Sequence, residues 1–294
     1  MGVVNVTPDS FSDGGAFLDP ARAVAHGLQL ARDGADILDV GGEATNPHAT
    51  AIDADEELRR VLPVIEQLAA TGATVSIDTT KAVVARAAVA AGARIINDVS
   101  GGLFDPAMAA VVADLDVTYI AGHLRGSSLD QVFSREADES PANCDLRGRE
   151  AGRPLSPTVK SDLRGREAGR PLSPTVNWRD VAAELADRLA VLPVAARART
   201  WVDPGIGFGK GADPAVNLAL LRHAGDLGRA LGCRVVVGPS RKRFLRTLIA
   251  DDAGSSLDVA SVAACLAAVQ HGAQVLRIHN VALLRAALAV YTKV

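Results

Sequence analysis

The sequence of 294 residues contains only three cysteines, Cys144, Cys233 and Cys265. They are odd in number, widely spaced and part of no CxxC pair, so they indicate neither a disulfide framework nor a zinc site, and we interpret them as reduced thiols. The chain also lacks an excess of basic residues, since 31 Lys and Arg stand against 34 Asp and Glu. The formal net charge of -3 therefore excludes the basic surface that binding to nucleic acid or to an anionic membrane requires.

Long apolar runs are absent as well. No stretch approaches the length of a membrane span, and no charged start precedes an apolar signal region. We therefore expect a cytoplasmic protein without nucleic-acid or membrane partners, whose ligands are small, polar or anionic molecules. Hydrophobic residues make up 48% of the chain, which suffices for one large core.

Short runs rich in Val and Ile alternate with longer stretches of helical period, which is the pattern of βα units around a parallel sheet. Eight such runs predict strands, at residues 3–6, 37–42, 74–79, 95–100, 118–123, 200–205, 234–240 and 275–280. Segments 19–35 and 53–72 have apolar residues spaced three and four apart and predict outer helices. Eight βα units in a chain of this length favour an α/β fold, the (β/α)8 TIM barrel, over the alternative of an open doubly wound sheet.

A glycine stands between a predicted helix and the following strand at three places. Gly34, Gly92 and Gly272 each precede a buried strand directly. A helix often ends on a residue in the left-handed conformation, which glycine adopts without strain. We predict that these glycines cap their helices in that conformation.

One segment, residues 127–177, shows neither a strand nor a long apolar helix. Within it DLRGREAGRPLSPTV occurs at 145–159 and again at 162–176, a tandem repeat with a period of 17 residues. Two short copies cannot build a solenoid, and their Pro, Gly and Arg content predicts a disordered loop inserted after the fifth strand. The net charge of +3 over 145–176 leaves a basic lid over an anionic substrate as the alternative. We expect residues 1–294 to form one barrel domain, with 127–177 as an inserted loop.

Polar residues gather at the carboxyl ends of the predicted strands. They are Asn5, Asp39, Glu43, Asp78, Asn97, Asp98, His123, Asp203, Ser240, Arg277 and His279, with Lys242 just beyond. In a TIM barrel these ends form the active face, and a barrel kept only for stability does not need such a ring. Carboxylates and amides suit a heterocycle with several N–H and C=O groups, whereas Arg, His and backbone N–H groups suit phosphate.

The opening stretch places Asn5 at a strand end, before a loop that carries Thr7, Asp9, Ser10 and Asp13. These oxygen ligands could bind a hydrated Mg²⁺ ion or a pyrophosphate. The sequence Thr-Pro-Asp-Ser is equally typical of an ordinary turn, so this stretch alone leaves both interpretations open.

Eight motifs follow one another along the chain. They are MGVVNVTPDSFSDGG (1–15), DVGGEATNP (39–47), SIDTTK (76–81), INDVSGG (96–102), GHLRG (122–126), DPGIGFGK (203–210), SRKRF (240–244) and RIH (277–279). In this order they resemble the dihydropteroate synthases, a family of pterin-binding enzymes. The resemblance covers almost the whole chain apart from residues 127–177, and the combination of motifs is highly specific.

The resemblance implies a transferase of folate biosynthesis. In this family the amine of p-aminobenzoate displaces pyrophosphate from 6-hydroxymethyl-7,8-dihydropterin pyrophosphate, and the product is 7,8-dihydropteroate. The resemblance further implies Mg²⁺ as the cofactor. It also implies a homodimer, for which the apolar content of segments 256–273 and 281–294 exceeds what one inward face needs.

The resemblance assigns roles to individual residues. The pterin-binding set is Asp78, Asn97, Asp203 and Lys242, of which Asp78, Asp203 and Lys242 are the catalytic candidates. The pyrophosphate side comprises Asn5, Thr45, Arg277 and His279, with Asn5 as the metal ligand. The edges of the p-aminobenzoate pocket are Phe11, Pro47, Phe208, Ser240 and Arg241.

Several of these residues also have purely structural interpretations. Asp203 precedes Pro-Gly and could shape a turn, and Asp78 could cap a helix that begins near Thr80. His123, at a predicted barrel rim, could equally be a hydrogen-bonded structural residue. Arg277 and His279 alternate along one strand and therefore share a face, which favours a common function.

The chain departs from the family pattern at two positions near the predicted site. Asn46 stands where the family has Arg, and Asn cannot supply the bidentate positive charge that Arg offers to phosphate. Asn280 stands where the family usually has Asp. These changes predict altered sulfonamide sensitivity, and two other functions stay open: a pterin-binding paralogue without synthase activity, and a corrinoid-linked methyltransferase that uses methyltetrahydrofolate.

Overall fold

The computed structural model describes residues 1–7, 20–44, 51–126, 128, 131–132, 177–210, 213–249 and 254–294. Three of the predicted site residues, Phe11, Thr45 and Pro47, lie outside the described residues, and so does Asn46. The tandem repeat and most of the segment predicted to be a disordered insertion lie outside them too.

Eight parallel strands form the sheet, and their order in space follows their order in the sequence. They are β1 (Gly2–Asn5), β2 (Leu38–Gly41), β3 (Val75–Asp78), β4 (Ile95–Asp98), β5 (Thr118–Gly122), β6 (Thr200–Asp203), β7 (Arg234–Val237) and β8 (Val275–Leu276). All eight predicted strands are confirmed, although most predicted ranges continue past the carboxyl end of the observed strand. At these extra residues the chain leaves the ladder to form the loops of one face.

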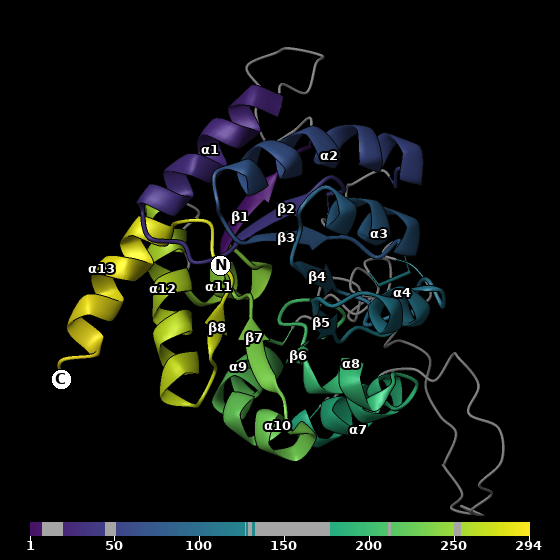
Figure 1. Cartoon of the computed structure of the whole chain (residues 1–294). Coiled ribbons are helices and arrows are strands. Elements are labelled where there is room, and N and C mark those ends of the chain that lie inside the picture. The colour runs from purple at the N-terminus through teal and green to yellow at the C-terminus, as the bar shows by residue number, and fades with distance from the viewer. Residues whose placement is uncertain are drawn as a thin grey trace, which may run out of the picture.

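The last strand meets the first one. Gly2 and Ile278 form a parallel bridge, the Val3 N–H donates to the Ile278 carbonyl at 3.2 Å, and the Ile278 N–H donates to the Met1 carbonyl at 3.0 Å. The sheet thus curls back on itself, as Figure 1 shows around its centre. Sequential strand order and this contact confirm the (β/α)8 TIM barrel and contradict the open doubly wound sheet.

Helices surround the sheet (Figure 1). They are α1 (Pro20–Arg32), α2 (Ala54–Ala70), α3 (Ala82–Ala90), α4 (Met108–Asp114), α7 (Trp178–Ala190), α8 (Val194–Ala198), α9 (Pro214–Arg222), α10 (Ala224–Leu231), α11 (Arg243–Ile249), α12 (Gly254–Gln270) and α13 (Val281–Tyr291). Within the described part of the chain, no single helix has the length and apolar composition needed to cross a membrane. Among the described helices, only α11 and α12, which form a bent pair, meet both criteria when they are taken together.

The predicted glycine caps are confirmed. Gly34 follows α1 with a φ of +96°, Gly92 follows α3 with a φ of +115°, and Gly272 follows α12 with a φ of +91°. A side chain would be strained in this left-handed region, which is why glycine stands where each helix turns back into a strand.

Apolar side chains form two clusters, one on each face of the sheet, because successive side chains of a strand point to opposite faces. Val40, Ile77 and Ile96 point outward into the large core between sheet and helices. Ile95 and Ile120 point the other way, into a smaller cluster inside the barrel. Because successive side chains of a strand lie on opposite faces, the residue two positions after each inner apolar residue also faces the barrel interior.

Candidate functional site

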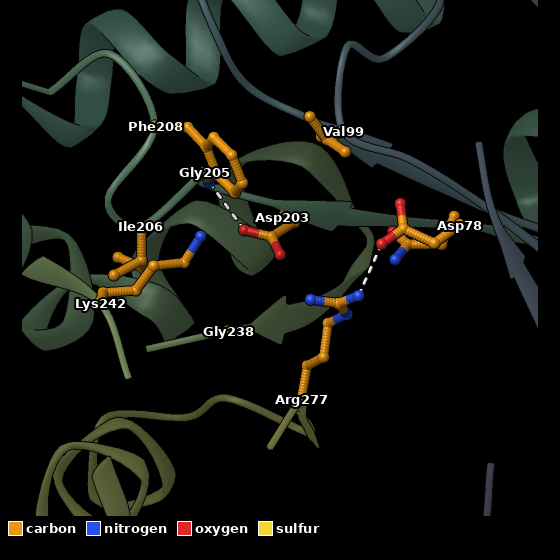
Figure 2. A pocket seen from close by; sticks show the side chains of 11 residues that line it. Asp78, Val99, Asp203, Gly205, Ile206, Phe208, Gly238, Lys242 and Arg277 are labelled. Carbon is orange, nitrogen blue, oxygen red and sulfur yellow. Dashed lines mark hydrogen bonds and ion pairs between the residues drawn. The ribbon is translucent and has the colours of Figure 1, made fainter. Parts of the chain in front are cut away.

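A pocket lies at the carboxyl ends of the strands, on the face where barrel enzymes bind their ligands. Its lining consists of Asp78, Asn97, Val99, Gly122, Asp203, Gly205, Ile206, Phe208, Gly238, Lys242 and Arg277. Figure 2 shows the charged side chains of Asp78, Asp203, Lys242 and Arg277 converging on it. The four residues predicted to bind the pterin, namely Asp78, Asn97, Asp203 and Lys242, therefore line one pocket together.

The period of the strands explains this convergence. Ile95 in β4, Trp201 in β6 and Val275 in β8 belong to the apolar cluster inside the barrel. Two residues further along these chains stand Asn97, Asp203 and Arg277. The interior is thus apolar in its lower layer and polar in the layer above, and the polar layer forms the floor of the pocket.

Arg277 bridges two carboxylates at the edge of the pocket. Its Nε donates to Asp39 Oδ2 at 2.6 Å and its Nη2 donates to Asp78 Oδ2 at 2.6 Å. Asn97 Nδ2 donates to the same Asp39 oxygen at 3.0 Å. Burial lowers the pKa of Arg277, but the charges of Asp39 and Asp78 outweigh this effect and raise the pKa above its usual value. Arg277 therefore stays positively charged.

Asp78 is the carboxylate of this pair that faces the pocket. Burial raises the pKa of Asp78 to about 7, because the charged form is poorly solvated and Asp39 lies close, while Arg277 opposes the rise. The interpretation of Asp78 as a helix cap is wrong. Helix α3 begins at Ala82 with Lys81 at its N-cap position, and its first N–H, that of Ala82, donates to Asp105 Oδ2 at 2.8 Å.

Asp203 ends β6 and faces the pocket from the opposite side (Figure 2). The Gly205 N–H donates to Asp203 Oδ1 at 2.7 Å, so this side chain does shape the Pro-Gly turn as well as line the pocket. Gly205 has a φ of +72°, and a Cβ at this position would lie 1.8 Å from the His123 carbonyl oxygen. Burial raises the pKa of Asp203, against the Gly205 hydrogen bond and the charge of Lys242.

Lys242 and Phe208 lie together at the pocket wall. The Lys242 Nζ is 3.5 Å from the centroid of the Phe208 ring, which is a cation–π contact. Phe208 belongs to the glycine-rich loop after β6, and Lys242 follows β7. The pocket wall thus presents a positive charge against an aromatic face, and a flat conjugated ring can interact with both groups.

Ser240 and His279 form a pair outside the lining of this pocket. Ser240 Oγ lies 2.9 Å from His279 Nδ1, and the His279 N–H donates to Ser240 Oγ at 3.2 Å. Burial, followed by the charges of Arg277 and Arg241, lowers the pKa of His279 to about 3. His279 is therefore neutral and can offer phosphate a hydrogen bond but no charge.

Arg241 does not line the pocket and is held by helix α12. Its backbone has a φ of +57°, its N–H donates to Ser261 Oγ, and its guanidinium binds Asp258 at 2.8 and 3.1 Å. Asn280 donates to the same Asp258 at 3.0 Å, and its Oδ1 accepts the Leu283 N–H to cap α13. Asn280, which replaces the usual Asp of the family, thus caps the N-terminus of α13.

Asn5 occupies the carboxyl end of β1, opposite Gly41 of β2. It is partly buried, and the loop that follows it lies outside the described residues. Within the described ranges no group of three or more His, Cys, Asp or Glu side chains could hold a metal ion.

The sequence assigned no role at the site to two buried acidic residues, although Asp39 belongs to the polar residues at the predicted strand ends. Asp39 is fully buried and orients Arg277, and its position two residues after Ile37 in an inward-facing pattern was the available signal. Glu57, also fully buried, accepts from Lys81 at 2.6 Å, and Lys81 binds Glu43 at 2.7 Å. A lone acidic residue on the apolar face of a predicted helix was the signal for Glu57.

Comparisons with known proteins agree with this geometry. The family model described as "Pterin binding enzyme" matches residues 1–279. The dihydropteroate synthase of Mycobacterium leprae is 41% identical over 292 residues, which cover 96% of this chain and 88% of that protein.

Solved structures give the same result. The dihydropteroate synthase of Xanthomonas albilineans with 4-aminobenzoic acid has a TM-score of 0.76 and 39% identity, covering 99% of this chain and 91% of that one. Its complex with 7,8-dihydropteroate has a TM-score of 0.75 and 38% identity, covering 100% and 92%. Sequence, fold and pocket agree, and the chain belongs to the dihydropteroate synthase family of pterin-binding enzymes.

Proposed function

We propose that this protein condenses 6-hydroxymethyl-7,8-dihydropterin pyrophosphate with p-aminobenzoate to give 7,8-dihydropteroate and pyrophosphate. The observation that carries this proposal is one pocket lined by Asp78, Asn97, Asp203, Lys242 and Arg277. The complex of the Xanthomonas albilineans relative with 7,8-dihydropteroate supports the same ligand chemistry here.

Pterin recognition is assigned to the floor of the pocket. Asp203 accepts hydrogen bonds from the amino and ring N–H groups of the pterin, and the Gly205 N–H keeps its carboxylate oriented for this purpose. Asn97, held by its bond to Asp39, presents its amide to the ring edge. Lys242 moves from the Phe208 ring to a ring acceptor, so that Phe208 becomes available for stacking.

The chemical step needs positioning and charge stabilisation more than a nucleophile from the protein. The C–O bond to pyrophosphate breaks, positive charge develops on the pterin, and the amine of p-aminobenzoate forms the C–N bond and releases a proton to solvent. Asp78 faces this developing charge. Since its pKa is about 7, the ionised form that stabilises a cation is available at neutral pH.

The p-aminobenzoate pocket is assigned to residues at the rim. Phe208 supports this assignment directly because it lines the pterin pocket and projects from the loop above it. Ser240 and Arg241 stand on the neighbouring loop after β7. For Phe11 and Pro47 the assignment depends on the sequence alone.

The pyrophosphate side is assigned to Arg277, His279, Asn5 and Thr45. Arg277 supplies the positive charge and His279 a neutral hydrogen bond, as their pKa directions indicate. Asn5 would hold Mg²⁺ through its amide oxygen. This fits an ion that takes most of its ligands from phosphate oxygens and water, and that neutralises the charge of the leaving group. Omission of Mg²⁺ should raise the KM for the pterin substrate, and an unchanged KM would contradict this assignment.

A homodimer is part of the proposal. Helices α12 and α13, near the C-terminus of the chain, pack side by side on the outside of the barrel (Figure 1). Val259 of α12 is 60% exposed and Val290 of α13 is 66% exposed, so both helices carry large apolar side chains on their outer faces. A monomer in light scattering at micromolar concentration would refute the dimer.

A coupled assay tests the proposed reaction. Purified protein is mixed with the pterin pyrophosphate and Mg²⁺, and pyrophosphate release is followed with and without p-aminobenzoate. Release that depends on p-aminobenzoate supports the synthase. Pterin binding in calorimetry without such release would indicate the inactive paralogue, and binding of a cobalamin protein would indicate the methyltransferase.

A further inference from the structure

A chain of four side chains, two buried and two partly buried, lies behind the pterin pocket. Lys210 and His123 are 3% and 1% exposed. The Lys210 Nζ lies 3.0 Å from His123 Nδ1, 3.0 Å from the His123 carbonyl oxygen and 2.9 Å from the Phe208 carbonyl oxygen. On the other side of the ring, His123 Nε2 lies 3.0 Å from Glu184 Oε2, and Arg125 binds both oxygens of Glu184.

These distances indicate how the protons are distributed among the four side chains. In its protonated form Lys210 has three protons and faces three acceptors, so every proton is used. Burial lowers the pKa of Lys210 to about 7, so this form prevails below neutral pH. His123 then accepts at Nδ1 and carries its own proton on Nε2, which donates to Glu184. Burial, followed by the charge of Lys210, lowers the pKa of His123 to about 3, which agrees with a neutral ring.

Lys210 closes the loop that carries two residues of the pocket. The loop begins at Asp203, whose carbonyl accepts the His123 N–H at 2.9 Å, and returns to Phe208, whose carbonyl accepts from Lys210. Between them Gly205 passes so close that a Cβ there would lie 3.0 Å from the Lys210 Nζ. The ammonium group therefore packs directly beneath the turn whose N–H orients the Asp203 carboxylate.

We propose that Lys210 is a positioning residue for the pterin pocket, which holds the Asp203–Phe208 loop from behind through its hydrogen bonds to the His123 and Phe208 carbonyl oxygens. Lys210 does not line the pocket, so it acts through Asp203 and Phe208. Glu184 and Arg125 support it by fixing the tautomer of His123. This inference rests on the proposed synthase function.

The test compares Lys210→Met with wild type. Methionine has a similar length but no donor, and the exposed Lys293→Met serves as the matched control because it removes the same charge far from the loop. In Lys210→Met we expect the KM for the pterin substrate to rise by about tenfold, which corresponds to ~1.4 kcal/mol. The kcat at saturating substrate should fall by less than about threefold, and Lys293→Met should change neither constant.

Comparing the change in KM with the change in kcat distinguishes a positioning role of Lys210 from a role in stability alone. A purely structural role would reduce the amount of folded enzyme, and so would lower kcat at an unchanged KM. An unchanged pterin KM in Lys210→Met would therefore overturn the proposal. If that variant does not fold, Lys210→Gln, which keeps a donor for one carbonyl, should show a smaller rise in KM, and an unchanged KM there would overturn the proposal equally.

Failure of the proposed function gives a different result. A folded wild-type protein without synthase activity refutes the synthase, whatever Lys210 does. Calorimetric titration with 7,8-dihydropteroate then still tests the positioning role: about tenfold weaker binding in Lys210→Met supports it, and equal binding overturns it.

Discussion

Asp78→Asn should stabilise the protein at alkaline pH and at the same time remove synthase activity. Asp78 is buried beside Asp39, and both carboxylates share the single guanidinium of Arg277. Asparagine has nearly the shape of the protonated carboxyl group but carries no charge to desolvate. The substitution therefore relieves a cost in the folded state, and it deletes the charge that we assign to the stabilisation of the pterin cation.

The sign and size of the effect follow from the pKa of Asp78. It is raised to about 7 in the folded protein, so between pH 4 and pH 7 the folded state binds this proton more tightly than the unfolded chain does. The free energy of unfolding therefore falls as pH rises through this range, and the loss is complete above pH 7. A pKa rise from about 4 to about 7 corresponds to at most ~4 kcal/mol.

Urea unfolding measures the difference between wild type and Asp78→Asn at about pH 5 and about pH 8.5. We expect the variant to be more stable by about 1 to 4 kcal/mol at the higher pH, with a smaller advantage at the lower pH. Asp116→Asn is the matched control, because the Asp116 side chain is fully exposed. An advantage that is equal at both pH values, or a variant less stable than wild type at pH 8.5, would refute the reasoning.

Four further predictions follow from the site and its surroundings. Asp203→Ala should abolish pterin binding in calorimetry, because the ring donors lose their acceptor at a cost of ~1 to 3 kcal/mol or more; undiminished binding would remove Asp203 from the site. Deletion of one repeat copy, residues 145–161, should leave stability and turnover nearly unchanged, since loop entropy grows only logarithmically with length. A large rise in the KM for the pterin substrate would instead revive the basic lid. Lys81→Met should lower the free energy of unfolding by about 3 kcal/mol in urea titrations, because it leaves the buried Glu57 without its ion pair, and an unchanged stability would show that Glu57 is protonated. Asn46→Arg should increase sulfonamide affinity measured with pyrophosphate and Mg²⁺ present, and equal affinities in both proteins would show that another cation already serves the phosphate.

The sequence by itself determined the barrel and the floor of its pocket. Strand period, helix period and glycine caps are local properties, so each can be read from a few neighbouring residues. Because the carboxyl ends of eight parallel strands must meet on one face, polar residues at these ends had to come together there. Asp78, Asn97, Asp203 and Arg277 follow from this rule without any knowledge of their side-chain partners.

Only the tertiary structure decided how these side chains pair. Arg277 binds Asp39 across 238 positions of the chain, and His123 meets Glu184 across 61. The structure also turned Arg241 toward Asp258 and placed Lys210 behind Asp203. Which ion pair a charged side chain forms depends on the distance to each possible partner and on how well each rotamer keeps the charge solvated. Both depend on how elements far apart in the sequence pack together.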